Sequence, residues 1–584
     1  MPSQNDTTRA QSPEAVTGVQ LAQGIGQQPT RGFWSEAWEQ VIRRPGAIFG
    51  LTWIAIVGFF AVFSPVLASG HPLVMHEIGP DGSVTNTVYP MLENLKSTDV
   101  LLLLGAIAGF IWMFAPLRID RSTRLGVLMA VALQCGLTVI VVSLIRSVTT
   151  GRDVSDSMRS LEQSATFVPV VSGVVALVMS AAVVFMVPFE RWLPRIITVG
   201  VAGLITAVVI AMTWTTPIER YDYRQREARG EVRAVYTLIP LSPQQGDTTL
   251  NIKAPGSNML EPAVERFGRS TLVRSRLRDL AAADETGSFI NLPLADRLAS
   301  VPIDEEIVSI ANGEIRSQAQ LLRVTGDELV AEMRNRIDDG SIRTARDIID
   351  WMHAVPVERF VLGTDSLGQD VLSQMMHACR LSISIGLVST IIAVIIGVTV
   401  GALMGYFGGW VDLLLYRVVE IFMSIPVLFL LIIAAAVLPR NTYIMMIIIG
   451  CVSWTGAARF VRAEFFKLRN QDFVQSARAV GLPLPSILFK HMLPNGVTPV
   501  LVDSSFAIAA AILAEATLSY LGLGPANQAS WGRLLSDATN QVGAFVWWLA
   551  IFPGMAIFLT VLSYNLIGEA FRDAIDPKLK KARV

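Results

Sequence analysis

Long apolar runs constrain the fold of this chain more than any other feature of its sequence. They lie at roughly 47–68, 99–117, 125–145, 167–188, 195–216, 382–405, 414–438, 442–460, 498–520 and 546–569. A helix of about 20 apolar residues is long enough to cross the hydrocarbon core of a bilayer. Only 16% of the residues are charged, against about 25% in soluble chains. The sequence therefore predicts an all-α integral membrane protein with about ten transmembrane helices in contact with membrane lipid.

Charges in the loops predict the orientation of these helices. Arg43 and Arg44 precede the first run, and the loops after the second, fourth and eighth runs also carry arginine or lysine. Such loops normally face the cytoplasm. We therefore expect a protein of the cell (inner) membrane with cytoplasmic N- and C-termini. The polar stretch 217–379 should then be external.

The remaining composition excludes several classes of protein. The formal net charge is -1, and no basic stripe with interleaved aromatic residues suggests a nucleic-acid partner. The cysteines Cys135, Cys379 and Cys451 lie in or beside apolar runs, which argues against a disulfide framework. His71 and His76 are a weak metal signal on an irregular loop, and we expect no metal site.

Two segments outside the runs differ in character. Residues 1–30 are rich in Gln, Thr, Ser and Gly, which predicts a disordered tail. Residues 217–359 contain amphipathic patterns near 270–283 and 342–354, which predict a small, mostly helical soluble domain. No nucleophile–base set is visible in it, so we interpret it as a spacer or docking platform.

The loop after the eighth run contains the most informative pattern, at 472–494. Asp472 is suited to cap a short helix, with Gln475 placed three residues later to complete a capping box. Gly481 can end this helix in a left-handed turn, and Pro485 suits the first turn of a second helix. Two short helices joined at a glycine would form a rigid knob on the cytoplasmic side.

This loop resembles the EAA motif of ABC importer permeases, which reads Glu-Ala-Ala, Gly, Ile and Leu-Pro at fixed spacing. The matching positions are Gln475, Ser476, Ala477, Gly481, His491, Leu493 and Pro494. Gln475, Ser476 and His491 depart from the motif. Glutamine can still close a capping box, whereas a role that needs a negative charge at position 475 is not available.

Neighbouring segments resemble the C-type permease subunit of the dipeptide/oligopeptide/nickel family. The segment before the sixth run is similar to that family's Gly-Thr-Asp-x-x-Gly-Arg-Asp motif, with Gln369 at the arginine. Its matching residues are Gly363, Thr364, Asp365, Gly368 and Asp370.

The resemblance covers 31–68 and about 360–580, and it implies a core of six spans made of the first run and the last five. The segment 69–216 is then an insertion with four extra spans. Because four is an even number, the insertion leaves the orientation of the core unchanged. We expect these spans to form a peripheral bundle that does not line the pathway.

The resemblance also implies partners. They are a homologous second permease subunit, two ATP-binding subunits at the cytoplasmic loop and an external solute-binding protein. The chain contains no Gly-x4-Gly-Lys-Ser/Thr phosphate loop, so we expect it to bind no cofactor and to rely on its partners for ATP hydrolysis. The alternatives are a stand-alone secondary transporter or channel and a membrane-bound enzyme. Neither an internal repeat nor a catalytic set supports them.

Ionisable residues in predicted spans are candidates for function. Glu420 lies three residues after Arg417, so the two side chains should neutralise each other. Glu515 has no partner apparent on its own helix, and it could bridge to another helix or face the pathway. Pro426 belongs with these two as a residue of the pathway or of helix packing.

Overall fold

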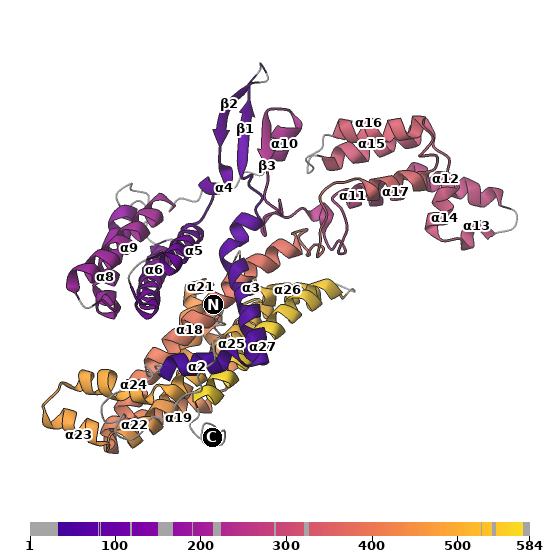
Figure 1. Ribbon diagram of the computed structural model, residues 1–584. Helices are drawn as coiled ribbons and strands as arrows, with labels where there is room; N and C mark the ends of the chain where they lie inside the picture. Colours follow the sequence, from indigo (N-terminus) through magenta and orange to yellow (C-terminus); the bar gives the residue numbers. More distant parts are fainter. Residues whose placement is uncertain are drawn as a thin grey trace, which may run out of the picture.

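The computed structural model describes residues 33–575 except for 80, 82, 117–118, 150–166, 190, 214–222, 285–287, 320–325, 527 and 540–544. The predicted tail, 1–30, lies outside the described residues. So do residues 576–580, at the end of the family-like region. The described chain is predominantly helical, and Figure 1 shows a body of long helices with two smaller parts at its upper end.

The described residues include eight helices that are each long and apolar enough to cross a membrane. Counting two bent pairs as one span each raises the number to ten, as predicted. The eight single helices are α3 (Pro45–Leu67), α5 (Ser97–Phe114), α6 (Arg121–Thr149), α8 (Phe167–Val183), α9 (Trp192–Met212), α18 (Val371–Phe407), α25 (Thr498–Tyr520) and α27 (Trp547–Ile575).

The other two spans are broken. The first consists of α19 (Gly409–Ser424) and α20 (Val427–Val437), which meet at 83°. Pro426 causes this break, because proline lacks an N–H and forces the residue before it into an extended conformation; Ile425 has φ -93 and ψ 127. The second consists of α21 (Thr442–Ser453) and α22 (Thr455–Leu468), bent by 42°.

The long helix α18 forms the centre of the body. It has 37 residues and packs against α3, α21, α22 and α25, while α27 packs against α3 and α25. Two short helices complete this part: α2 (Phe33–Ile42) packs against α27, and α26 (Trp531–Thr539) packs against α25 and α27. The six predicted core spans therefore form one packed unit.

The inserted helices α5, α6, α8 and α9 form a separate four-helix bundle, which we call the bundle. The short 3₁₀ turn η1 (Val184–Met186) follows α8. Figure 1 shows the bundle beside the body, where α5 packs on α3 and α6 packs on α21. This peripheral position agrees with the prediction.

A small β-sheet, which the sequence did not predict, stands at the upper end of Figure 1. The strands β1 (Val74–Ile78), β2 (Val84–Val88) and β3 (Val232–Val235) are antiparallel in the order β2-β1-β3. Met75 lies opposite both Val88 and Ala234. The short helices α4 (Pro90–Glu93) and α10 (Tyr223–Ala228) adjoin the sheet. Strand β3 comes from the polar stretch after the insertion, so the sheet joins the two ends of the insertion.

Residues 258–360 form the second smaller part, which we call the arm. Its helices are α11 (Glu261–Arg269), α12 (Thr271–Ala283), α13 (Ser288–Asn291), α14 (Leu294–Ala299), α15 (Glu305–Ala319), α16 (Gly326–Asp338) and α17 (Ala345–Ala354). They enclose an apolar core of their own that includes Phe267, Ile307 and Met333. The mostly helical domain predicted at 217–359 is therefore observed over a shorter range, because the part before the arm contributes α10 and strand β3 of the sheet.

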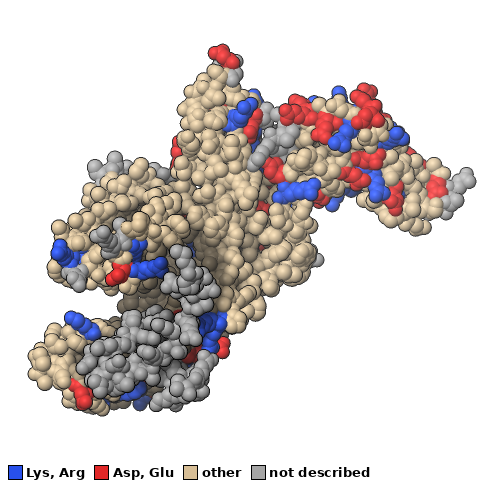
Figure 2. Space-filling model, viewed as in Figure 1, with Lys and Arg blue, Asp and Glu red and all other residues tan. Residues whose placement is uncertain are grey.

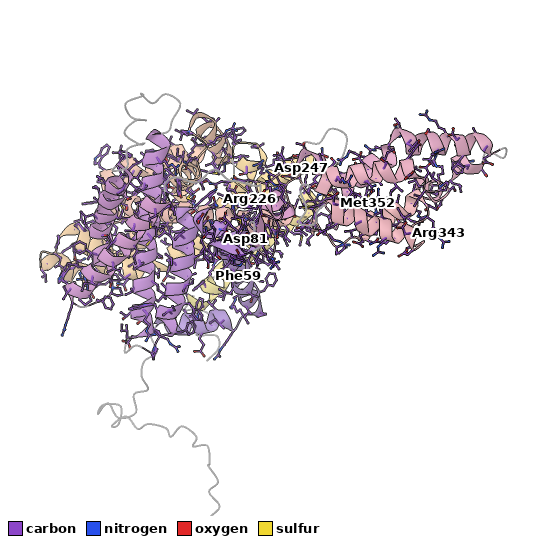
Figure 3. The ribbon with its side chains drawn as sticks, turned by 90° about the horizontal axis from the view of Figure 1, so that it is seen from above. Phe59, Asp81, Arg226, Asp247, Arg343 and Met352 are labelled. Carbon is purple, nitrogen blue, oxygen red and sulfur yellow. The ribbon has the colours of Figure 1, made fainter. Side chains whose placement is uncertain are left out.

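The arm differs from the rest of the molecule in its surface and its position. Acidic and basic side chains crowd its surface, whereas the body beside it is largely uncharged (Figure 2). Seen from above, the arm, which carries Arg343 and Met352, extends sideways beyond the membrane-spanning helices (Figure 3). It is joined to the body by the segment that leads into α18.

Candidate coupling site

The loop after α22 folds into the predicted knob, residues 472–494, which we call the coupling knob. Its first helix is α23 (Asp472–Ala479), and the π-helical turn η3 (Ser486–Met492) and α24 (Leu493–Gly496) follow. Gly481 has φ +79, as the left-handed turn requires. The Gly481 and Leu482 N–H groups donate to the carbonyls of Arg478 and Ala477 at 2.9 and 3.2 Å. This pair of bonds is a Schellman motif, which fixes the direction in which the chain leaves the helix.

The start of the knob differs from the prediction. The N-cap of α23 is Gln471, and no side chain caps the helix. Asp472 is instead the first helical residue. Its carboxylate interacts favourably with the positive end of the helix dipole, but it makes no capping hydrogen bond. The capping box predicted between Asp472 and Gln475 is therefore wrong. Of the remaining motif residues, Ala477 is buried, Ser476 is exposed, and Leu493 and Pro494 begin α24.

The inner face of the knob packs against the body. Val474, Ala477 and Met492 belong to the same buried cluster as Phe465 of α22 and Ala402 of α18. The guanidinium of Arg478 also lies over the Tyr406 ring, 4.4 Å from its centroid, near the end of α18. A displacement of the knob would therefore move α18 and α22 with it, because protein interiors are too densely packed to absorb it.

A charged contact fixes the same end of α22 to α19. Arg462 donates two hydrogen bonds to Asp412, at 2.5 and 2.8 Å. Its guanidinium also lies 4.4 Å from the centroid of the Tyr416 ring. Two parallel hydrogen bonds from arginine to a carboxylate define the geometry more strictly than a single contact. The broken span α19–α20 is thus held to the helix that carries the knob.

The opposite end of α18 begins in the predicted Gly-Thr-Asp segment. Thr364 accepts a hydrogen bond from the Lys253 N–H at 2.7 Å and donates to the Leu250 carbonyl at 2.6 Å. Its own carbonyl accepts from the Trp548 indole of α27 at 3.1 Å. Gly363, with φ +80, passes so close to the Lys253 carbonyl that a Cβ there would lie 2.6 Å from that oxygen. This segment therefore joins the chain before the arm to α18 and α27.

Two buried carboxylates of this segment have structural roles. Asp365 accepts hydrogen bonds from the Leu367 and Gln369 N–H groups at 2.8 Å and from the Gln374 side chain at 2.7 Å. Asp370 caps α18 by accepting from the Ser373 N–H at 2.7 Å. Gly368 has φ +70, so it permits the tight turn between them.

Burial changes the acidity of this cluster. It raises the pKa of the Asp370 carboxyl to about 7, and the nearby Asp365 adds to the rise. Burial and Asp365 also raise the pKa of Asp537, on α26, to about 6. Both carboxyls therefore change charge between acidic and neutral pH.

Comparison with known proteins shows which family this sequence resembles. Residues 397–581 match the family described as the binding-protein-dependent transport system inner membrane component, and 32–80 match the N-terminal transmembrane domain of oligopeptide transport permease C. The chain is 39% identical over 234 residues to the oligopeptide transport system permease protein OppC of Haemophilus influenzae. That match covers 39% of this chain and 75% of the relative.

The chain belongs to this family of permeases. Other relatives include the dipeptide transport system permease protein DppC of Alkalihalophilus pseudofirmus, at 36% identity over 37% of this chain and 72% of the relative. The peptidoglycan transport system permease protein YejE of Agrobacterium fabrum is 41% identical over 37% of this chain and 57% of the relative. The two family matches flank 81–396, a segment that includes most of the predicted insertion.

The structure gives both predicted intramembrane acids, Glu420 and Glu515, hydrogen-bond partners. Arg417 donates to Glu420 at 2.6 Å, as predicted. Glu515 is fully buried, and its Oε1 accepts from Ser519 at 2.6 Å and from Ser530 at 2.8 Å. Ser519 lies on the same helix, so the expectation that Glu515 has no partner there is wrong. The bonds show that Glu515 joins α25 to the segment before α26. Pro426 lies exposed at the bend between α19 and α20.

A contact that the sequence analysis missed lies between α18 and α22. Gly397, Gly401 and Gly405 recur every four residues and face α22 so closely that a Cβ at each would lie 2.4–2.6 Å from an α22 atom. Small residues at this spacing allow two helix backbones to approach each other. The signal was present as Gly-x3-Gly-x3-Gly within an apolar run. It positions α18 directly against the helix that leads to the coupling knob.

Proposed function

We propose that this permease is the membrane-spanning subunit of an ATP-driven ABC importer for peptides or related small solutes. The coupling knob carries the proposal, because it is a rigid two-helix projection continuous with the packing of α18 and α22. The relatives named above are permeases of oligopeptide, dipeptide and peptidoglycan transport systems. Their names support a peptide-like solute for this chain.

The exposed side of the knob fits a soluble partner. Val480 is 78% exposed beside the Gly481 turn, and Phe473 and Phe489 are also exposed. Exposed apolar side chains on a rigid element are typical anchors of protein interfaces. We therefore assign this surface to the ATP-binding subunits, two of which would serve this chain and a homologous second permease. These subunits would supply the ATP chemistry, for which this chain has no phosphate loop.

The arrangement of the parts supports the proposed orientation. Figure 1 shows the knob and the arm at opposite ends of the body. Arg44, at the start of α3, forms an ion pair with Asp573 near the end of α27, so both ends of the described chain lie together. Loops rich in arginine and lysine normally face the cytoplasm, so we place the end of the body that carries the knob on the cytoplasmic side. The sheet and the arm would then be external, where a solute-binding protein delivers its cargo.

Reconstitution tests this function. The permease, co-purified with a second permease and ATP-binding subunits from its source, is placed in liposomes with ATP inside and the solute-binding protein with labelled peptide outside. We expect peptide to accumulate inside only when ATP is hydrolysable. Equal accumulation with a non-hydrolysable nucleotide, or accumulation driven by an ion gradient in the permease alone, would refute the proposal.

A further inference from the structure

A polar junction joins the bundle to the core. Its centre is Arg380 on α18, whose guanidinium is mostly buried and forms an ion pair with Asp99 of α5. Asp99 is buried as well, and its second oxygen accepts the Lys96 N–H at 3.0 Å. Asp99 thus holds the start of α5 and the core helix α18 at the same time.

A proline in α3 explains why arginine occupies this position. Pro65 lies inside α3 and has no N–H, so the Ala61 carbonyl four residues earlier loses its normal helical donor. The Arg380 Nε donates to that carbonyl at 3.0 Å. A freed backbone carbonyl within a membrane must find another partner, because no water is available there. Arg380 therefore satisfies α3 of the core with one nitrogen and Asp99 of the bundle with another.

The junction also reaches α21. Tyr443, in the first turn of α21, lies close enough to Ser143 of α6, and to Arg380 and Asp99, to interact with each of them. Helix α6 packs on α21 at this point. Since α21 continues through one bend into α22, which leads to the coupling knob, the bundle contacts the first half of the broken span that ends at the knob.

We propose that Asp99 and Arg380 lock the bundle onto the permease core and thereby hold α21 in the arrangement that keeps the coupling knob in its resting position. The bundle then restrains motion without lining the pathway. Asp99 acts through Arg380, so it is a positioning residue. Loss of the pair should let α6 separate from α21 and should release the knob in the absence of solute.

Cysteine cross-linking measures the contact itself. In a chain whose three native cysteines are replaced by alanine, Ser143→Cys and Tyr443→Cys introduce a pair across the α6–α21 contact, which a short bis-maleimide reagent can bridge. We expect Asp99→Asn to slow formation of this cross-link about ten-fold, on the order of the equilibrium effect of one hydrogen bond to a charged group. Asp99→Glu should restore much of the rate. Glu93→Gln, at an exposed carboxylate on α4, is the matched control and should change nothing.

The second measurement is solute-independent ATP hydrolysis by the complete transporter, and it rests on the proposed function. Asp99→Asn should raise this basal rate several-fold while membrane levels stay constant, and Asp99→Glu should return it toward the parent value. Arg380→Gln provides a second test, because glutamine can still donate to the Ala61 carbonyl. Unchanged cross-linking in both Asp99→Asn and Arg380→Gln would overturn the lock. Absence of an ATPase partner would refute only the proposed function, since cross-linking needs none.

Discussion

Replacing Gly401 by alanine should destabilise the permease through the contact between α18 and α22. A Cβ at Gly401 would lie 2.5 Å from the Ala458 carbonyl oxygen and 2.8 Å from the Val461 Cβ. Both are closer than normal van der Waals contact. The carbonyl belongs to the backbone of α22, so no side-chain rotation can relieve the clash and the helices must separate.

The expected magnitude follows from the cost of overpacking. Inserting a methyl group into a closely packed interior typically costs about 1–3 kcal/mol. Alanine also favours helix over glycine by roughly 0.5–1 kcal/mol, which offsets part of that cost. The net loss for Gly401→Ala should therefore be about 0.5–2 kcal/mol, and Gly401→Leu should abolish assembly of α18 with α22.

Unfolding of the detergent-purified permease, followed by tryptophan fluorescence across a denaturant series, measures this loss. Gly200→Ala on α9 is the matched control, because no heavy atom lies within 4 Å of a Cβ there. Only the higher helix propensity of alanine then affects stability, so Gly200→Ala should be neutral or stabilising. A Gly401→Ala protein as stable as the parent, beside a Gly200→Ala protein that behaves as expected, would refute the close-packing argument.

Three further predictions concern other parts of the molecule. Gly481→Val should abolish ATP-driven uptake at normal membrane levels, because a β-branched residue resists φ +79; Gly481→Asn, which tolerates that conformation, should retain uptake, and equal uptake by both would contradict this role. The Asp370 carboxyl has its pKa raised to about 7, so the folded protein binds this proton more tightly than the unfolded chain. The stabilisation that this carboxyl contributes should therefore be greatest below about pH 4 and be lost as the pH rises to about 7, and Asp370→Asn should weaken this dependence in unfolding curves; an unchanged pH profile would exclude the carboxyl as its source. A cysteine at Ser288 on the arm should react with a membrane-impermeant reagent in intact cells, and reaction only after permeabilisation would reverse the orientation.

The sequence predicted the spans well because a bilayer imposes a minimum length of apolar helix that can be counted directly. It could not predict that the run at 414–438 bends by 83°, since an exposed Pro426 is also compatible with a modest kink. The sequence analysis missed the small β-sheet for a different reason. Strand β2 reads Val-Thr-Asn-Thr-Val and is almost wholly exposed, so it has no alternation of apolar and polar residues to recognise.

In the coupling knob, too, features that depend on neighbouring residues were predictable, whereas features that depend on tertiary contacts were not. Gly481 and its left-handed turn were predictable, because they depend on one residue and its neighbours along the chain. The capping role predicted for Asp472 was wrong because the helix begins one residue earlier than the pattern suggested, which makes Asp472 the first helical residue. The contacts of Arg478 with Tyr406 and of Arg380 with Ala61 join segments far apart in the sequence, and only the packed structure reveals them.

Site-specific photo-cross-linking from position 480 tests the central claim most directly. Val480 is the most exposed large apolar residue of the coupling knob, and a photo-reactive residue there can be introduced without disturbing the buried face. In the assembled transporter, we expect it to cross-link to the ATP-binding subunit, whereas the same residue at Ile290 on the arm should not. A complex that hydrolyses ATP but gives no cross-link from position 480, or gives one from position 290 instead, would contradict the assignment of residues 472–494 as the coupling knob.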